Sequence, residues 1–209
     1  MATSTTFENL PRWLTRQVTN PAMLRRIEAR YDKLYLDRPR YDHPKLQWHI
    51  TANILPGLAL YQVLLEDGLT LEAARAEVAR VMQASLVEDN RFRMGLIKHL
   101  PFGFNLLRRL VKRTMKHDFP EPGFTTVWAE NSPDRIAFYM TRCLYLNTLA
   151  HYGAPELTSA FCCANDNAQF ALLEPAIHFE RAGTLGGGAP ACDFCFRPGS
   201  TSRTSPSLN

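Results

Sequence analysis

The chain changes character at residues 120–123, and this change constrains its fold more than any other feature. Before this Pro- and Gly-containing break, apolar residues recur at spacings of three and four, which is typical of amphipathic helices. After it, several short stretches alternate apolar and polar residues, as half-buried strands do. The sequence therefore predicts an α+β fold, with a helical N-terminal half packed on a small antiparallel sheet that the C-terminal half forms.

The helical half is predicted to contain several separate helices. Pro11 and Pro21 interrupt the apolar pattern of residues 7–35, so short helices are expected there. Residues 46–65 are strongly apolar and helix-like, and Pro56 either kinks this element or opens its second half. Thr70 is a good N-cap for the next helix, whose apolar stripe ends near residue 85.

The C-terminal half is predicted to alternate strands and short helices. A triple glycine, Gly186-Gly187-Gly188, separates the last two expected strands and is interpreted as a turn that could also serve as a substrate loop. We expect strands at residues 124–128, 135–141, 176–181 and 191–196, and helices at residues 144–152 and 154–162.

The 209 residues fit one domain, which is expected to span residues 7–196 between a loose leader at 1–6 and a disordered, Ser/Thr/Pro-rich tail at 197–209. Hydrophobic residues make up 45% of the chain, which excludes wholesale disorder. No apolar run is long enough to span a bilayer, and the N-terminus has no apolar segment of the secretory kind. We therefore expect a cytoplasmic protein.

Charge identifies one unusual segment. The net charge of +4 is too small to indicate a nucleic-acid partner, but residues 91–117 hold eight Lys and Arg residues and no acidic residue. A basic amphipathic helix of this kind either lies on an anionic membrane surface or packs its apolar face on the core with cationic stems at the edges. We favour the packing interpretation, because the charge is spread among apolar residues; a homo-oligomer is left open.

The five cysteines all fall in the last third of the chain and are expected to stay reduced. Zinc binding is not favoured, because adjacent thiols fit a zinc knuckle poorly and the two thiols of the CxxC pattern point to opposite faces of a strand. A redox CxxC normally opens a helix, which this one does not. The histidines are scattered, so neither a metal nor a cofactor is predicted. The cysteines are Cys143, Cys162, Cys163, Cys192 and Cys195.

The order of rare residues in the C-terminal half resembles that of a known enzyme family. The pattern consists of Phe138-x-x-Thr141-Arg142-Cys143-x-Tyr145, Gly153-x-x-Glu156-Leu157, Phe161-Cys162-x-x-Asn165-Asp166, Arg181-x-x-Thr184-Leu185-x-x-Gly188 and Cys192-Asp193-Phe194. It is similar to the 2-aminothiazoline-4-carboxylate hydrolase family, and the likeness extends over about residues 45–197. The reaction that names this family is the hydrolytic opening of a 2-aminothiazoline ring towards a carbamoyl-cysteine.

The resemblance implies a small-molecule substrate and a hydrolase that acts on a C–N bond. Either Cys162 or Cys192 attacks the ring carbon, or Asp166 or Asp193 activates water. Arg142 or Arg181 pairs the substrate carboxylate. The remaining expected substrate-binding residues are Cys143, Phe161, Phe179, Thr184, Gly188 and Phe194. We expect the site where residues 162–166 meet residues 181–193.

Two other functions are compatible with the sequence. The chain has Asn165-Asp166 where we expect an acidic pair from the family, which agrees with a non-hydrolytic natural-product tailoring enzyme, a cyclase or pericyclase that orients a reactive intermediate. The third hypothesis is a non-enzymatic ligand- or membrane-binding module in which residues 91–117 provide the contact.

Overall fold

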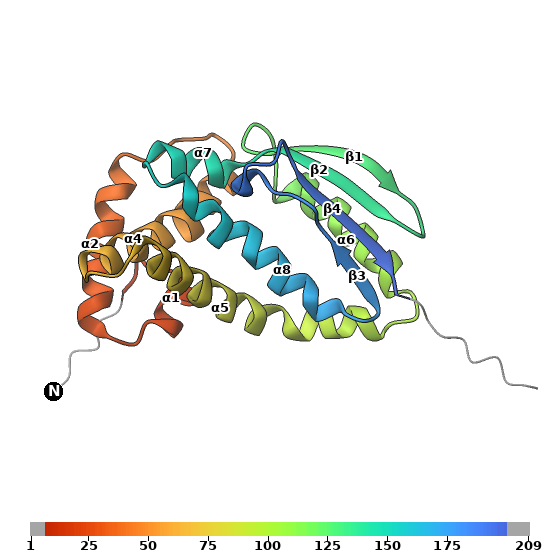
Figure 1. Ribbon diagram of the computed structural model, residues 1–209, viewed down its shortest axis with the longest axis horizontal. Helices are drawn as coiled ribbons and strands as arrows, with labels where there is room; N and C mark the ends of the chain where they lie inside the picture. The colour runs from red at the N-terminus through yellow and green to blue at the C-terminus, as the bar shows by residue number, and fades with distance from the viewer. Residues whose placement is uncertain (1–6, 200–209) are drawn as a thin grey trace, which may run out of the picture.

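The computed structural model describes residues 7–199 and has the expected α+β architecture (Figure 1). The helical half contains α1 (Arg12–Gln17), α2 (Pro21–Leu36), α3 (Pro44–His49), η1 (Ile50–Ile54), α4 (Leu55–Glu66), α5 (Leu71–His99) and α6 (Gly103–His117). The C-terminal half contains β1 (Thr125–Asn131), β2 (Ile136–Arg142), α7 (Leu144–His151), η2 (Pro155–Leu157), η3 (Ser159–Cys163), α8 (Ala164–Phe170), η4 (Ala171–Leu173), β3 (Ile177–Glu180), η5 (Leu185–Gly187) and β4 (Cys192–Pro198). In Figure 1, α1, α2, α4 and α7 gather at one end and the sheet lies at the other.

Helix α5 connects the two ends of the molecule. It begins where Thr70 Oγ1 accepts a hydrogen bond from the Ala73 amide at 3.2 Å, as the sequence predicts. It continues to His99, well past residue 85, because Met94 and Ile97 extend its buried face. The close turn into α6 brings the α-carbon of Gly103 against the Ile97 carbonyl, where a β-carbon would not fit.

The basic segment 91–117 is therefore divided between the end of α5 and α6. Leu107 and Val111 of α6 are buried, whereas Arg109, Lys112 and Arg113 are exposed. Helix α6 thus turns its apolar face inward and its charges outward. Among the described helices, none is both long and apolar enough to cross a bilayer.

Pro56 shapes the long apolar element of the N-terminal half. Proline has no N–H to donate to the carbonyl four residues before it, which here belongs to Ala52. The helix widens into the π-helical η1 just before Pro56, and the indole Nε1–H of Trp13 donates to the Ala52 carbonyl at 2.8 Å. The apolar element at residues 46–65 is thus α3, η1 and α4 in sequence, and Pro56 lies in the first turn of α4, so it opens the second half of the element.

The sheet is antiparallel throughout, with strand order β1-β2-β4-β3. Its buried face is aromatic: Phe138 of β2 lies opposite Phe194 of β4, and their rings stack with centroids 4.6 Å apart. Phe196 follows on the same face of β4 and is fully buried. Cys195 lies between them on the opposite face, where Arg135 Nε donates to its sulfur at 3.4 Å.

Two predictions from the sequence need correction. Residues 154–162 do not form a regular helix: they contain the 3-10 turn η2 and the beginning of η3, which leads into the unpredicted α8. Helix α8 packs along α5. Arg197 and Pro198, which were assigned to the tail, belong to β4. The predicted leader at 1–6 and the rest of the tail, residues 200–209, lie outside the described residues.

Candidate active site

Four cysteines meet between the sheet and the short helices of the C-terminal half. Cys143 lies between β2 and α7, Cys162 and Cys163 lie in η3, and Cys192 begins β4. The register of the sheet explains part of this meeting, because Cys192 pairs with Met140, three residues before Cys143. The sulfurs of Cys162 and Cys163 are 3.8 Å apart, and all five cysteines of the chain are free thiols.

Cys163 is the thiol of this cluster whose surroundings favour a thiolate. Hydrogen bonds from Cys162 and from Cys192 are the largest causes that lower its pKa, and the Thr184 hydroxyl and the charge of Arg181 lower it further. Interaction with Cys143, and then with Cys163, raises the pKa of Cys162, and interaction with Cys163 raises the pKa of Cys192, so these two thiols favour the protonated form. The pKa of Cys143 is also lowered by its hydrogen bond with Cys162. Thr184 and Arg181 also lower the pKa of Cys163, but they do not contribute to the lowered pKa of Cys143.

The glycine turn orients two of the groups around Cys163. Thr184 Oγ1 accepts a hydrogen bond from the Gly187 amide at 3.0 Å, so its own proton is available to Cys163. The Leu185 amide donates to the Cys192 sulfur at 3.2 Å. Gly188 closes the turn in the left-handed region, with φ of 88°. The turn thus supplies donors to the thiol cluster.

Arg181 is buried beside the cluster and is held on several sides. Only 6% of its side-chain surface is exposed. Its Nη2 donates to Asp166 Oδ2 at 2.8 Å, and its Nε donates to the Asp193 carbonyl at 3.3 Å. The guanidinium also lies 4.0 Å from the ring centroid of Phe194. The buried Nη1 has no hydrogen-bond partner within residues 7–199.

Asp166 lies in surroundings that favour its protonated form more than is usual for a carboxylic acid. Burial raises its pKa to about 6, and the charge of Arg181 and its hydrogen bond oppose this shift only in part. Solvent still reaches 31% of its side-chain surface. A group with a pKa of about 6 can both give and take a proton near neutral pH.

The other predicted site residues have different surroundings. Asp193 accepts hydrogen bonds from the amides of Ala182 and Gly183 at 2.8 and 2.7 Å, so its carboxylate closes a turn. Phe161 is fully buried and fills the space that the absent side chain of Gly57 leaves, so it contacts the core. Phe179 lies under Arg181, whose Cζ is 5.2 Å from its ring centroid.

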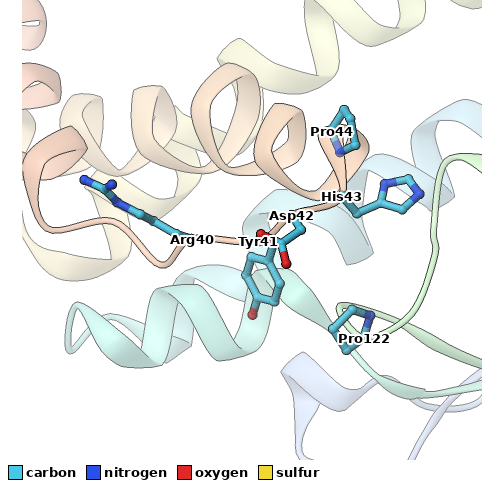
Figure 2. A pocket seen from close by; sticks show the side chains of 6 residues that line it. All are labelled: Arg40, Tyr41, Asp42, His43, Pro44 and Pro122. Atoms are coloured by element: carbon cyan, nitrogen blue, oxygen red, sulfur yellow. The ribbon is translucent and has the colours of Figure 1, made fainter.

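Arg142 lies apart from these contacts. It is exposed and its Nη1 donates to the Pro122 carbonyl at 3.2 Å. Pro122 lines a surface hollow of about 490 Å³, and Figure 2 shows it across from Asp42 and His43. A second hollow of about 510 Å³ lies between Trp13, Trp48 and Asn53. The cysteines line neither of these two hollows.

The sequence interpretation missed three residues of this region. Cys163 was not assigned a role, although it adjoins Cys162. Tyr145 was part of the residue pattern but was likewise left without a role, and it lies almost buried next to the cluster, where its hydroxyl contacts His49. His49 had no sequence signal at all, because its partners come from distant parts of the chain.

No group of three or more His, Cys, Asp or Glu side chains within residues 7–199 is arranged to hold a metal ion. Instead, the sulfurs of Cys162 and Cys163 are in hydrogen-bond contact at 3.8 Å, and Cys143 and Cys192 lie close enough to this pair to change the pKa of its thiols. Together with the Arg181–Asp166 ion pair, the arrangement places thiols, a buried guanidinium and a carboxyl group within one region.

Comparison with known proteins identifies the family of this chain. The family model described as L-2-amino-thiazoline-4-carboxylic acid hydrolase matches residues 47–196, a span that includes the thiol cluster, Arg181 and Asp166. No curated protein and no solved structure matches the chain. Because the match covers well over half of the sequence, the chain belongs to the L-2-amino-thiazoline-4-carboxylic acid hydrolase family.

Proposed function

We propose that the protein hydrolyses the C–N bond of a 2-aminothiazoline-4-carboxylate ring, with Cys163 as the nucleophile. The observation that carries this proposal is the setting of Cys163: its sulfur lies 3.8 Å from that of Cys162, and its pKa is lowered by Cys162 and Cys192, then by Thr184 and the charge of Arg181. A lowered pKa increases the thiolate fraction, and the thiolate is the reactive form of cysteine. Family membership supports the choice of substrate class.

Arg181 supplies the binding group for the substrate carboxylate. Its free Nη1 can donate charge-assisted hydrogen bonds to a carboxylate oxygen, while Asp166, the Asp193 carbonyl and the Phe194 ring keep the guanidinium in place. A group that is already oriented loses little conformational entropy when the substrate binds. Arg142, the alternative from the sequence, is exposed and has a backbone partner at Pro122.

The chemistry proceeds in two steps through a covalent intermediate. The Cys163 thiolate bonds to the ring carbon between sulfur and nitrogen, and the C=N electron pair moves to the ring nitrogen. The ring nitrogen takes one proton from Asp166, which is partly protonated near pH 6, and a second from the exocyclic amino group. The C–N bond breaks as the exocyclic nitrogen forms a double bond to the carbon, and the ring nitrogen leaves as an amine. Water adds to the thioimidate carbon and loses a proton, and Cys163 leaves as the thiolate. The product is a carbamoyl-cysteine, and one water is consumed.

Turnover by a matched pair of cysteine variants tests this function. Purified protein is incubated with L-2-amino-thiazoline-4-carboxylate, and carbamoyl-cysteine is measured by mass spectrometry. Cys163→Ser is expected to lower kcat by ~10³-fold or more, as loss of a nucleophile does. Cys195→Ser is the control, because Cys195 lies on the other face of β4 and contacts Arg135.

The outcomes separate the alternatives. Absence of ring opening by the wild type contradicts the proposed function. Ring opening that survives Cys163→Ser contradicts Cys163 as the nucleophile and indicates attack by another thiol of the cluster or by water that Asp166 activates. If both variants lose activity in proportion to their loss of folded protein, a specific role for Cys163 is contradicted.

A further inference from the structure

Three large apolar side chains project into solvent where α5 turns into α6. Phe92, Leu96 and Phe102 are 81%, 54% and 58% exposed. Phe92 and Leu96 are four residues apart on α5 and therefore lie on the same face of that helix, and Phe102 directly precedes α6. Exposed apolar side chains scattered singly are ordinary, but a group of them on one short segment marks a contact surface.

The same segment carries charge of only one sign. Residues 91–117 contain eight Lys and Arg residues, whereas all 20 acidic residues of the chain lie outside the segment, together with the other 16 Lys and Arg residues. On α6 the exposed cations recur at spacings of three and four, so they form a stripe along its outer face. This cationic stripe consists of Arg109, Lys112, Arg113 and Lys116.

Carboxylates of the protein do not neutralise this segment. In the described part of the chain none of its eight cations forms an ion pair, whereas eight other Lys and Arg side chains do. Glu88 and Asp89, which precede the segment, contact Arg16. Asp118, which follows it, contacts Lys45. The positive potential of the segment is therefore available to an external anion.

An anionic lipid surface fits this combination better than a protein does. Phe92, Leu96 and Phe102 line neither of the two hollows described above, and their exposure shows that they protrude. A bilayer interface accepts protruding apolar side chains among its headgroups while Lys and Arg contact its anionic lipids. A second copy of the chain is disfavoured, because two such cationic faces repel each other.

We propose that the α5–α6 junction docks the protein on an anionic membrane surface. Phe92, Leu96 and Phe102 enter the headgroup region, and the cationic stripe contacts the lipid headgroups. Helix α6 keeps its packing on the core, because Leu107 and Val111 are buried on the opposite face from the stripe. The docking therefore needs no refolding, and it does not depend on the proposed function.

A solvated basic face is the competing explanation. In that case the cations attract any polyanion by charge alone, and the exposed apolar side chains contribute nothing to binding. The two explanations differ in the effect of Phe92→Gln/Leu96→Gln, which removes apolar surface and leaves every charge in place. They agree on Arg109→Gln/Lys112→Gln, which removes two charges of the stripe.

Flotation of the full-length protein with lipid vesicles tests the proposal. The vesicles consist of phosphatidylcholine alone or of phosphatidylcholine with roughly one-third phosphatidylserine, in about 0.1 M salt. The wild type is expected to float with the phosphatidylserine vesicles and not with phosphatidylcholine alone. Arg109→Gln/Lys112→Gln should lower the partition coefficient by ~10-fold or more, and Phe92→Gln/Leu96→Gln should also lower it by ~10-fold or more.

Two double variants remote from the junction are matched controls. Arg25→Gln/Lys33→Gln removes one Arg and one Lys that are exposed on α2, so it changes the net charge equally. Leu36→Gln/Leu71→Gln removes two leucines that are 79% and 61% exposed, one after another element and one at the start of α5. Both controls should keep the wild-type partition coefficient. All four double variants should keep the wild-type Tm, because the replaced side chains are exposed.

The remaining outcomes overturn the proposal. If the wild type does not float with phosphatidylserine vesicles, the docking surface is wrong. If Phe92→Gln/Leu96→Gln floats like the wild type, or if Arg25→Gln/Lys33→Gln loses as much binding as the stripe variant, charge alone accounts for the attraction. Binding to immobilised poly-L-glutamate but not to vesicles would indicate an acidic protein as the partner. None of these measurements involves the thiazoline, so the proposed function is tested separately.

Discussion

At the scale of single residues, the two aspartates of the candidate site have opposite environments. Asp166 lies partly buried next to Arg181, and this burial raises its pKa to about 6. Burial also acts on Asp193, but the amides of Ala182 and Gly183 outweigh it and lower the pKa of this carboxyl. One aspartate is therefore suited to proton transfer and the other to closing a turn. The sequence, which shows both next to cysteines, does not distinguish them.

This contrast predicts opposite effects of pH on stability. The folded state holds the proton of Asp166 more tightly than the unfolded state, whose pKa is about 3.9. The contribution of Asp166 to stability is thus present below about pH 4 and is lost as pH rises to about 6. The difference in unfolding free energy between wild type and Asp166→Asn should change by on the order of 1–3 kcal/mol across this window in urea titrations.

Asp193→Asn provides the control of opposite sign. The folded state favours the ionised form of Asp193, so its contribution is present above about pH 4 and is lost as pH falls below that value. The unfolding free energy of the wild type should fall relative to that of Asp166→Asn between about pH 4 and pH 6. If it does not fall, burial does not control the protonation of Asp166.

At the scale of elements, the prediction from sequence was best where a periodic pattern and a cap coincide. Thr70 marks the start of α5, and the alternating stretches locate all four strands to within a few residues. The irregular elements were not predictable in this way. Both π-helical segments depend on tertiary partners: Trp13 satisfies the Ala52 carbonyl in η1, and Gly57 leaves room for Phe161 in η3. Cys163 was missed because its partners are set by this irregular backbone.

The contact between the glycine turn and η3 can be tested at Gly186. A β-carbon there would lie 2.9 Å from Thr158 Cγ2 and 3.1 Å from the Ser159 amide nitrogen. Gly186→Ala should push η5 away from η3, destabilise the fold by about 1–3 kcal/mol and lower turnover of the folded fraction, because Thr184 and Leu185 shift from the thiols.

Gly95→Ala is the control for this change. Gly95 lies in α5, and a β-carbon there meets nothing within 4 Å. Alanine should stabilise that helix by roughly 0.5–1 kcal/mol and leave turnover unchanged. Thermal unfolding and kcat of both variants are the measurements, and equal effects at the two positions would contradict a role for the turn in holding the cluster.

At the scale of the whole molecule, the fold brings together side chains that lie far apart in the sequence. The strand order places β4 beside β2, and η3 and the glycine turn then meet over the ends of these strands. The family resemblance suggested that residues 162–166 meet residues 181–193, and Asp166 does contact Arg181. The approach of His49 to Tyr145 had no such signal, since it requires the helical half to pack against α7.

The central claim is that Cys163 forms the covalent bond to the substrate carbon, and mapping of the trapped intermediate tests it most directly. Wild-type protein is mixed with L-2-amino-thiazoline-4-carboxylate, quenched in acid during turnover, digested and analysed by tandem mass spectrometry. We expect an adduct of the substrate on Cys163, none on Cys195, and loss of the adduct in Cys163→Ser. An adduct on Cys162 or Cys192 instead, or turnover without any cysteine adduct, would contradict the account.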